Sequence, residues 1–172
     1  MELALIDAIG PFFRGYDKRR INWSKIPFAH LATDGPASEP QWQAIRADLE
    51  AFACKVARLG YNAVSLDDVA HLSDHPWFEP EIRARNAVFR RQFRELFGLL
   101  RAHGLGIFLT ADFVTTSVAV DARLGRSVAM ATKWFAEVVA RLLDEFPEIE
   151  GIILGVGEAD GRDVNDCLRS RL

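Results

Sequence analysis

Two hydrophobic patterns alternate along the chain: short apolar runs, and longer segments whose apolar residues recur at helical spacing. The short runs are rich in β-branched and aromatic residues and rarely alternate with polar ones, which is typical of strands buried on both faces of a parallel sheet. They lie at residues 26–32 (IPFAHLA), 61–68 (YNAVSLDD), 105–112 (LGIFLTAD) and 151–158 (GIILGVGE). The sequence therefore predicts four strands.

Long amphipathic segments fill the intervals between these runs. We predict helices over residues 38–59, 81–103 and 127–146. Ser38 stands where an N-terminal cap is expected, with Gln41 three residues later. Gly60 and Gly104 are suited to end the first two helices, and Pro147 ends the third.

The alternation of strands and helices predicts an α/β fold with a parallel sheet, because right-handed crossovers pack the helices on the sheet. Two architectures fit, a doubly wound open sheet and the beginning of a (β/α)8 barrel. The glycine fingerprint of a nucleotide-binding open sheet is missing, since no third glycine and helix follow Gly155-Val156-Gly157. We therefore expect a TIM-barrel-like half barrel with four strands and three long helices.

The length of 172 residues predicts a single domain, whereas a whole barrel takes about 250 residues. Three interpretations stay open: the first half of a longer protein, a truncated reading frame, or a half barrel that forms a homodimer through its open edges. Residues 1–20 are expected to be an irregular extension or to carry a short extra element.

The net charge of −3 gives no electrostatic case for binding nucleic acid or an anionic membrane. No apolar run approaches the roughly 18 residues of a membrane span, and the N-terminus does not resemble a signal peptide. Cys54 and Cys167 have no metal-ligand spacing, and Cys54 is predicted to be a buried thiol. We expect a cytoplasmic protein.

A basic run in the second helix is predicted to be a solvated face paired with nearby Glu: Arg83, Arg85, Arg90, Arg91 and Arg94.

Acidic side chains end three of the predicted strands. Asp67 and Asp68 end the run at 61–68, and Asp112 ends the next. Glu158 ends the last run, with Asp160 two residues later. Because the carboxyl ends of parallel strands meet at one side of the sheet, we expect these carboxylates around one rim.

Carboxylates held close raise one another's pKa, so that one can protonate a leaving oxygen while an ionised neighbour stabilises positive charge. Glycoside hydrolysis needs this pair of roles. A capping role is equally open for the aspartates, since Asp caps turns and helices well. Glu158 is harder to explain in that way, because Glu is depleted in strands and caps poorly.

The segment after the second predicted strand, VAHLSDHPWFEP, carries aromatic and histidine side chains. Trp77 near an acidic rim can stack on a sugar ring, or it can close the edge of the barrel together with Phe78. His71 and His75 with a nearby aspartate are a weak candidate for a metal site. His30, near the end of the first predicted strand, either reaches the rim or lies in the core.

Four segments of the chain resemble the first half of a barrel-fold glycoside hydrolase: INWSKIPFAHL, LGYNAVSLDD, HGLGIFLTAD and GIILGVGEADGRDV. A Glu at the end of strand four is the general acid/base of the large retaining clan, and Glu158 matches that position. The clan has Asn before this Glu, whereas this chain has Gly157. The clan's nucleophile lies on strand seven, so Asp112 or Asp68 must replace it if only this chain forms the site.

We therefore expect a carbohydrate-active protein that hydrolyses O-glycosides and needs no cofactor. Its catalytic residues are expected to be Glu158 and Asp112, and its substrate-binding residues Asp67, Asp68, Trp77, His30 and Asp160. Two alternatives are a non-catalytic sugar-binding or assembly module, and a metal-dependent barrel lyase or isomerase whose ligands are Asp68, Asp112 and Glu158.

Overall fold

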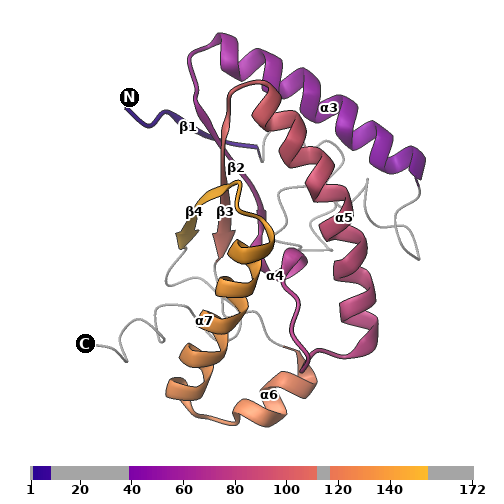
Figure 1. Ribbon diagram of the computed structural model, residues 1–172, viewed down its shortest axis with the longest axis vertical. Coiled ribbons are helices and arrows are strands. Elements are labelled where there is room, and N and C mark those ends of the chain that lie inside the picture. The colour runs from indigo at the N-terminus through magenta and orange to yellow at the C-terminus, as the bar shows by residue number, and fades with distance from the viewer. Residues whose placement is uncertain (1, 9–38, 112–116, 155–172) are drawn as a thin grey trace, which may run out of the picture.

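The computed structural model describes residues 2–8, 39–111 and 117–154 of the chain. Its sheet has four parallel strands in the order β1-β2-β3-β4 (Figure 1). The strands are β1 (Leu5–Asp7), β2 (Ala63–Asp68), β3 (Gly106–Ala111) and β4 (Ile149–Leu154). This order follows the chain without a reversal, whereas a doubly wound sheet reverses its strand order. The predicted α/β fold with a parallel sheet is confirmed, and the strand order matches the barrel-type alternative.

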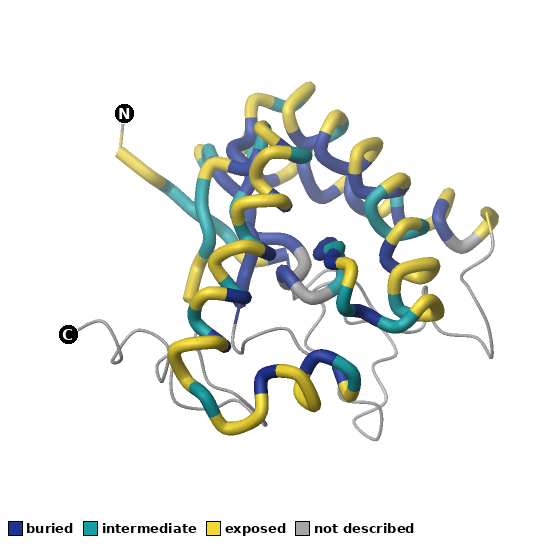
Figure 2. Tube along the Cα trace, turned by 60° about the horizontal axis from the view of Figure 1, so that its bottom comes forward, coloured by how far each residue is buried: buried dark blue, intermediate teal, exposed yellow. Residues whose placement is uncertain are grey.

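The helices lie between the strands along the chain. They are α3 (Glu39–Arg58), α4 (Val69–Leu72), α5 (Pro80–Ala102), α6 (Val118–Leu124) and α7 (Val128–Glu145). Figure 1 shows the three long helices α3, α5 and α7 packed on the same side of the sheet. Right-handed crossovers between successive neighbouring strands require this arrangement. Figure 2 shows the buried sides of these helices turned toward the strands.

The predicted second, third and fourth strands and all three predicted helices are confirmed to within a few residues. The predicted strand at 26–32 and the cap at Ser38 lie outside the described residues. In the segment 1–20, residues 5–7 form β1, which pairs with β2. The sequence gave no helical period for α4 and α6, because four and seven residues are too short to show one.

One core joins the helix layer to the sheet. Each fully buried Leu or Phe side chain contributes roughly 1.5–3 kcal/mol, so this layer is the main source of stability. Its largest members from the helices are Trp42, Ile45, Leu49, Phe93, Leu96, Phe97 and Trp134. The strands contribute Val64, Leu66, Ile107 and Leu109.

Two predictions about α3 are wrong. Cys54 is exposed, because it faces solvent while its neighbours Phe52 and Ala53 face the core. The predicted helix 38–59 included Leu59, but α3 ends at Arg58. Leu59 is 66% exposed because its side chain no longer follows the buried side of the helix.

Gly60 and Gly104 end α3 and α5 as predicted, with φ of 92° and 71°. At the end of α5 the backbone N of Gly104 donates to the carbonyl of Arg101, and Leu105 N donates to Leu100 O. This pair of bonds is a Schellman motif, in which glycine at positive φ satisfies the last carbonyls of the helix. The motif turns the chain sharply, and β3 begins two residues later at Gly106.

The face of the sheet away from the helices carries small residues around one aromatic ring. Ser65 pairs with Phe108, and Phe108 pairs with Gly151. Since successive strand residues alternate between faces, this row lies opposite the core row of Val64 and Ile107. A Cβ added at Gly151 would lie 2.6 Å from Cε1 of Phe108, so the ring lies over the glycine.

Candidate functional site

The carboxyl ends of the parallel strands lie at one end of the sheet, which we call the rim. Asp67 and Asp68 are the last two residues of β2, where the sequence placed them. Ser65 pairs with Phe108, whereas Asp68 pairs with Thr110, so β2 has one extra residue in this interval. Such bulges redirect the side chains that follow them and are common near active sites.

The remaining predicted rim carboxylates and His30 lie outside the described residues. Asp112 directly follows the last residue of β3, and Glu158 comes four residues after Leu154, the end of β4. Asp160 lies further along the same segment. The catalytic and substrate-binding roles of all these residues stay predictions.

Trp77 lies in the segment between α4 and α5, partly buried against the core. Its ring meets the His75 ring nearly edge to face, with centroids 5.2 Å apart. The guanidinium carbon of Arg123, in α6, lies 5.2 Å from the Trp77 ring centroid. One face of Trp77 is therefore occupied by a cation, and a sugar can stack only on the rest of the ring surface.

His75 is buried at the centre of an aromatic cluster. Its Nδ1 accepts hydrogen bonds from the backbone N of Trp77 and from Nε1 of Trp134 in α7, both at 3.2 Å. Because Nδ1 accepts from two donors, the neutral imidazole carries its proton on Nε2. This Nε2 lies 3.8 Å from a carboxylate oxygen of Glu137. Burial lowers the pKa of His75, Arg141 lowers it further, and Glu137 partly opposes both.

These contacts give His75 a structural role, since its ring joins the segment before α5 to α7. Among the described residues, no group of three or more histidine, cysteine or carboxylate side chains could hold a metal ion. The weak candidate metal site at His71 and His75 thus gains no support from the part of the chain that is described.

Glu79 joins the beginnings of α5 and α6. One of its carboxylate oxygens accepts a hydrogen bond from Ala119 N at 2.9 Å. Hydrogen bonds from Ser117 and Ala119 hold the pKa of Glu79 below its ordinary value. Ser117 caps α6 by accepting from Val120 N at 3.3 Å. The two segments that follow β2 and β3 are therefore fixed to one another beside the rim.

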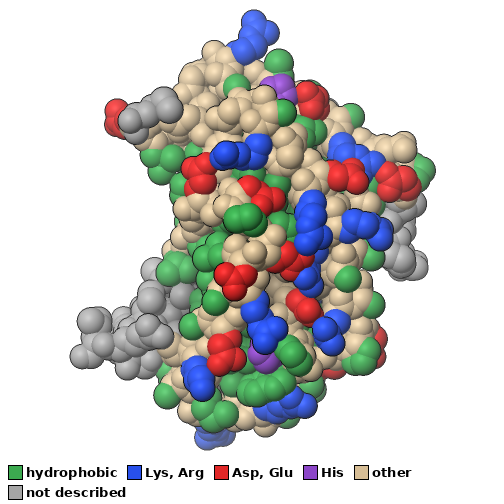
Figure 3. All heavy atoms as spheres, viewed as in Figure 1, with side chains coloured by type: hydrophobic (Ala, Val, Ile, Leu, Met, Phe, Trp, Pro, Cys, Tyr) green, Lys and Arg blue, Asp and Glu red, His purple; other side chains and the backbone are tan. Residues whose placement is uncertain are grey.

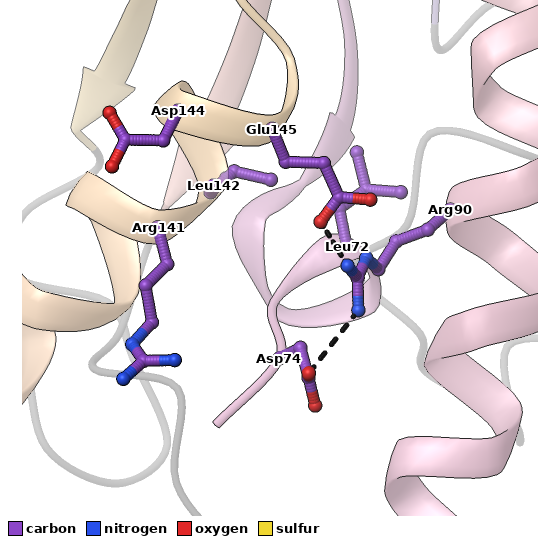
Figure 4. Close-up of a pocket in the computed structure, with 7 residues that line it drawn as sticks. All are labelled: Leu72, Asp74, Arg90, Arg141, Leu142, Asp144 and Glu145. Carbon is purple, nitrogen blue, oxygen red and sulfur yellow. Dashed lines mark hydrogen bonds and ion pairs between the residues drawn. The ribbon is translucent and has the colours of Figure 1, made fainter. Parts of the chain in front are cut away.

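A hollow of about 360 Å³ lies between α4, α5 and α7, on the helical side of the molecule (Figure 4). Glu145 and Asp74 point toward Arg90 from two sides and pair with it, Asp74 at 3.5 Å. Arg83 also binds Asp74, at 2.9 Å, and holds the pKa of that carboxyl below its usual range. Arg94 is a second partner of Glu145.

Arg83, Arg90 and Arg94 of the basic run thus pair with acids outside α5, whereas the sequence led us to expect nearby Glu. The charges around the hollow are largely used to join α5 to α7 and to the segment after α4. None of the residues that line the hollow is the last residue of a strand. We therefore regard it as a structural feature and place the candidate site at the rim.

Sequence reasoning did not single out Arg123 or the structural role of His75. Both depend on how α6 and α7 pack against the segment before α5, and no local pattern in the sequence encodes that packing. The histidine itself was noticed, but together with His71 and a nearby aspartate it suggested a weak candidate metal site instead.

The described residues form an α/β domain in which four parallel strands alternate with helices. No model of a known protein family matches the chain, and a search of curated proteins finds no match either. The resemblance to barrel glycoside hydrolases rests on the short motifs alone. Within the described ranges, no helix is long and apolar enough to cross a membrane.

Proposed function

We propose that this protein acts on carbohydrate and hydrolyses an O-glycosidic bond, with Glu158 as general acid/base and Asp112 as the second carboxylate. The observation that supports this proposal is the strand order β1-β2-β3-β4 in a wholly parallel sheet. In such a sheet the ends of neighbouring strands stand side by side, and active sites of barrel-type folds lie at those ends. Asp67 and Asp68 end β2, and in this proposal the segments after β3 and β4 bring Asp112 and Glu158 to the same side of the sheet.

The chemistry follows from two carboxyl groups of different protonation state. Glu158, protonated, donates its proton to the leaving oxygen as the glycosidic bond breaks. Asp112, ionised, either attacks the sugar or activates a water molecule. A separation of about 5–5.5 Å between the carboxyl groups would give retention, and about 6.5–9.5 Å would give inversion.

The other predicted rim residues would hold the sugar in this proposal. Asp67, Asp68 and Asp160 accept hydrogen bonds from hydroxyl groups, and His30 contributes a further polar contact. Trp77 packs against the apolar side of a sugar ring with the surface that Arg123 leaves open.

The proposal is tested by hydrolysis of a panel of glycosides by the purified chain and by two matched variants. Glu158→Gln should lower turnover by about 10²–10⁴-fold, the usual contribution of a general acid. Glu148→Gln, at the residue directly before β4, should leave turnover unchanged. Wild-type turnover in Glu158→Gln, with an unchanged circular dichroism spectrum, would remove Glu158 from the mechanism.

The same assay separates the alternatives. Binding of oligosaccharide without hydrolysis would favour a sugar-binding module. Turnover that chelation abolishes and a divalent ion restores would favour a metal-dependent lyase or isomerase.

We further propose that two copies of the chain associate through the edges of their sheets. In the described sheet, β1 and β4 each pair on one side only. Ile153 and Leu154 of β4 are 37% and 41% exposed, which leaves apolar surface at that edge. Two four-stranded halves would make the eight strands of a closed barrel. Light scattering should then give twice the mass of the chain, and a monomeric mass at micromolar concentration would contradict this assembly.

A further inference from the structure

Trp77 and Arg123 come together at the end of the molecule toward which the strands point. Trp77 precedes α5, and Arg123 lies in the last turn of α6 (Figure 1). The separation of 5.2 Å between the guanidinium carbon and the ring centroid is within the roughly 6 Å at which an aromatic ring attracts a cation. Figure 3 shows hydrophobic, basic and acidic side chains together on the surface over α6 and α7 at this end.

The guanidinium of Arg123 keeps hydrogen-bond donors available to a ligand. It has five N–H donors, and contact with a single ring leaves most of them unused. Arg123 is exposed and forms no ion pair with any residue in the described ranges. Arg83 and Arg90 on α5 differ from it, since Asp74 binds both.

We propose that Arg123, held in place by Trp77, binds the carboxylate of an anionic sugar, so that the substrate class is a uronic-acid-containing carbohydrate. This inference rests on the proposed function, which makes the ligand at the rim a carbohydrate. The planar fork of an arginine matches both oxygens of a carboxylate. A cation held by a ring loses less freedom on binding than a mobile one, which favours specific recognition.

The charge balance favours a carboxylate over a phosphate. A carboxylate brings one negative charge, which one guanidinium neutralises, whereas a phosphate monoester brings roughly 1.5–2. The sequence of β2 ends in Asp67-Asp68, and acidic residues in a binding site disfavour excess negative charge on a ligand. Arg126, in the turn after α6, is exposed and has no ring contact among the described residues.

The test compares sugars that differ only at C6. The probes are glucuronate, galacturonate and mannuronate, the parent neutral sugars, and the corresponding 6-phosphates. Binding is measured by NMR titration at one fixed ionic strength, for the wild type, Arg123→Gln, Trp77→Leu and Arg126→Gln. Arg126→Gln is the matched control, because it removes the same charge three residues away.

We expect a uronate to bind more tightly than its parent sugar. Arg123→Gln should weaken that binding by about 10- to 100-fold, as for the loss of a charge-assisted hydrogen-bonding group. Trp77→Leu should weaken it about threefold by releasing the guanidinium. Arg126→Gln should change uronate binding less than twofold, and Arg123→Gln should change the binding of neutral sugars less than twofold.

Neutral-sugar binding without a preference for uronates, or uronate binding that Arg123→Gln does not weaken, overturns this inference and leaves the proposed function standing. An equal loss in Arg126→Gln also overturns it, since net charge would then explain the effect. Tighter binding of the 6-phosphates overturns the assignment to a carboxylate. If the wild type binds none of the sugars, both the inference and the proposed function fail.

Discussion

Replacing His75 with alanine removes the ring that joins the segment before α5 to α7. The ring is 4% exposed, and its Nδ1 is the acceptor for Nε1 of Trp134, which is itself 2% exposed. The indole donor would lose its acceptor inside the core, which costs about 1–3 kcal/mol. The cavity left among the neighbouring rings of Trp77, Phe78 and Trp134 adds to this cost. We expect His75→Ala to lower the free energy of unfolding by about 3–5 kcal/mol in total.

The assay is urea denaturation followed by far-ultraviolet circular dichroism at pH 7.5. His75→Gln is the matched variant, because its side-chain oxygen can accept the bond from Trp134 and should recover about half of the loss. A loss below about 1 kcal/mol in His75→Ala, or equal losses in the two variants, would refute this account of the cluster.

The same ring predicts a pH dependence. Burial lowers the pKa of His75, with a further contribution from Arg141, while Glu137 and Asp74 act in the opposite direction. Between the folded pKa and the ordinary value of about 6.5, the unfolded chain binds more protons than the folded one. The wild type should therefore lose stability as the pH falls below about 6.5, and His75→Gln should lack this component of the loss. The difference between the two curves isolates His75 from the other histidines.

Three further predictions concern the helix ends, the sheet and the ion pairs. Gly98→Ala, in open space within α5, should stabilise the protein by about 0.5–1 kcal/mol, because alanine favours the helix over glycine. Gly104→Ala should destabilise it by about 1 kcal/mol, because residue 104 has a φ of 71° that alanine rarely adopts. Urea denaturation of both variants checks the opposite signs. Gly151→Ala should cost about 1–3 kcal/mol in the same assay because the new methyl group meets the Phe108 ring, and a neutral effect would contradict this packing. Glu145→Gln weakens two ion pairs with arginines of α5 and should cost about 1 kcal/mol, with a smaller loss in 1 M salt; a loss that salt does not change would argue against an electrostatic cause.

The periodic elements of the fold were predictable, because each has a local signal. Apolar spacing marked α5, and Gly104 marked its end through the positive φ that glycine adopts there. The continuous apolar runs marked β2 and β3 as strands covered on both faces. The sequence allowed a short extra element within residues 1–20 but did not identify β1, because three residues show no pattern and its pairing with β2 is non-local.

The surroundings of the rim were less predictable, since they depend on contacts between distant segments. Trp77 was predicted to be a platform for a sugar, but the cation above its ring comes from α6, 46 residues further along the chain. His75 suggested a metal ligand by spacing, whereas its ring accepts from an indole 59 residues away. The strand-end positions of Asp67 and Asp68 could be predicted, because they follow from the limits of β2 alone.

The most direct test of the proposed function is the dependence of the Glu158→Gln variant on the leaving group. A general acid is needed when the departing oxygen is strongly basic, and it is hardly needed when that oxygen is already stable as an anion. We predict that the variant loses about 10²–10⁴-fold in kcat/KM on alkyl glycosides and less than about tenfold on 2,4-dinitrophenyl glycosides of the same sugar. Equal losses on both substrates, or no loss on either, would contradict the assignment of Glu158 as the general acid and with it the proposed mechanism.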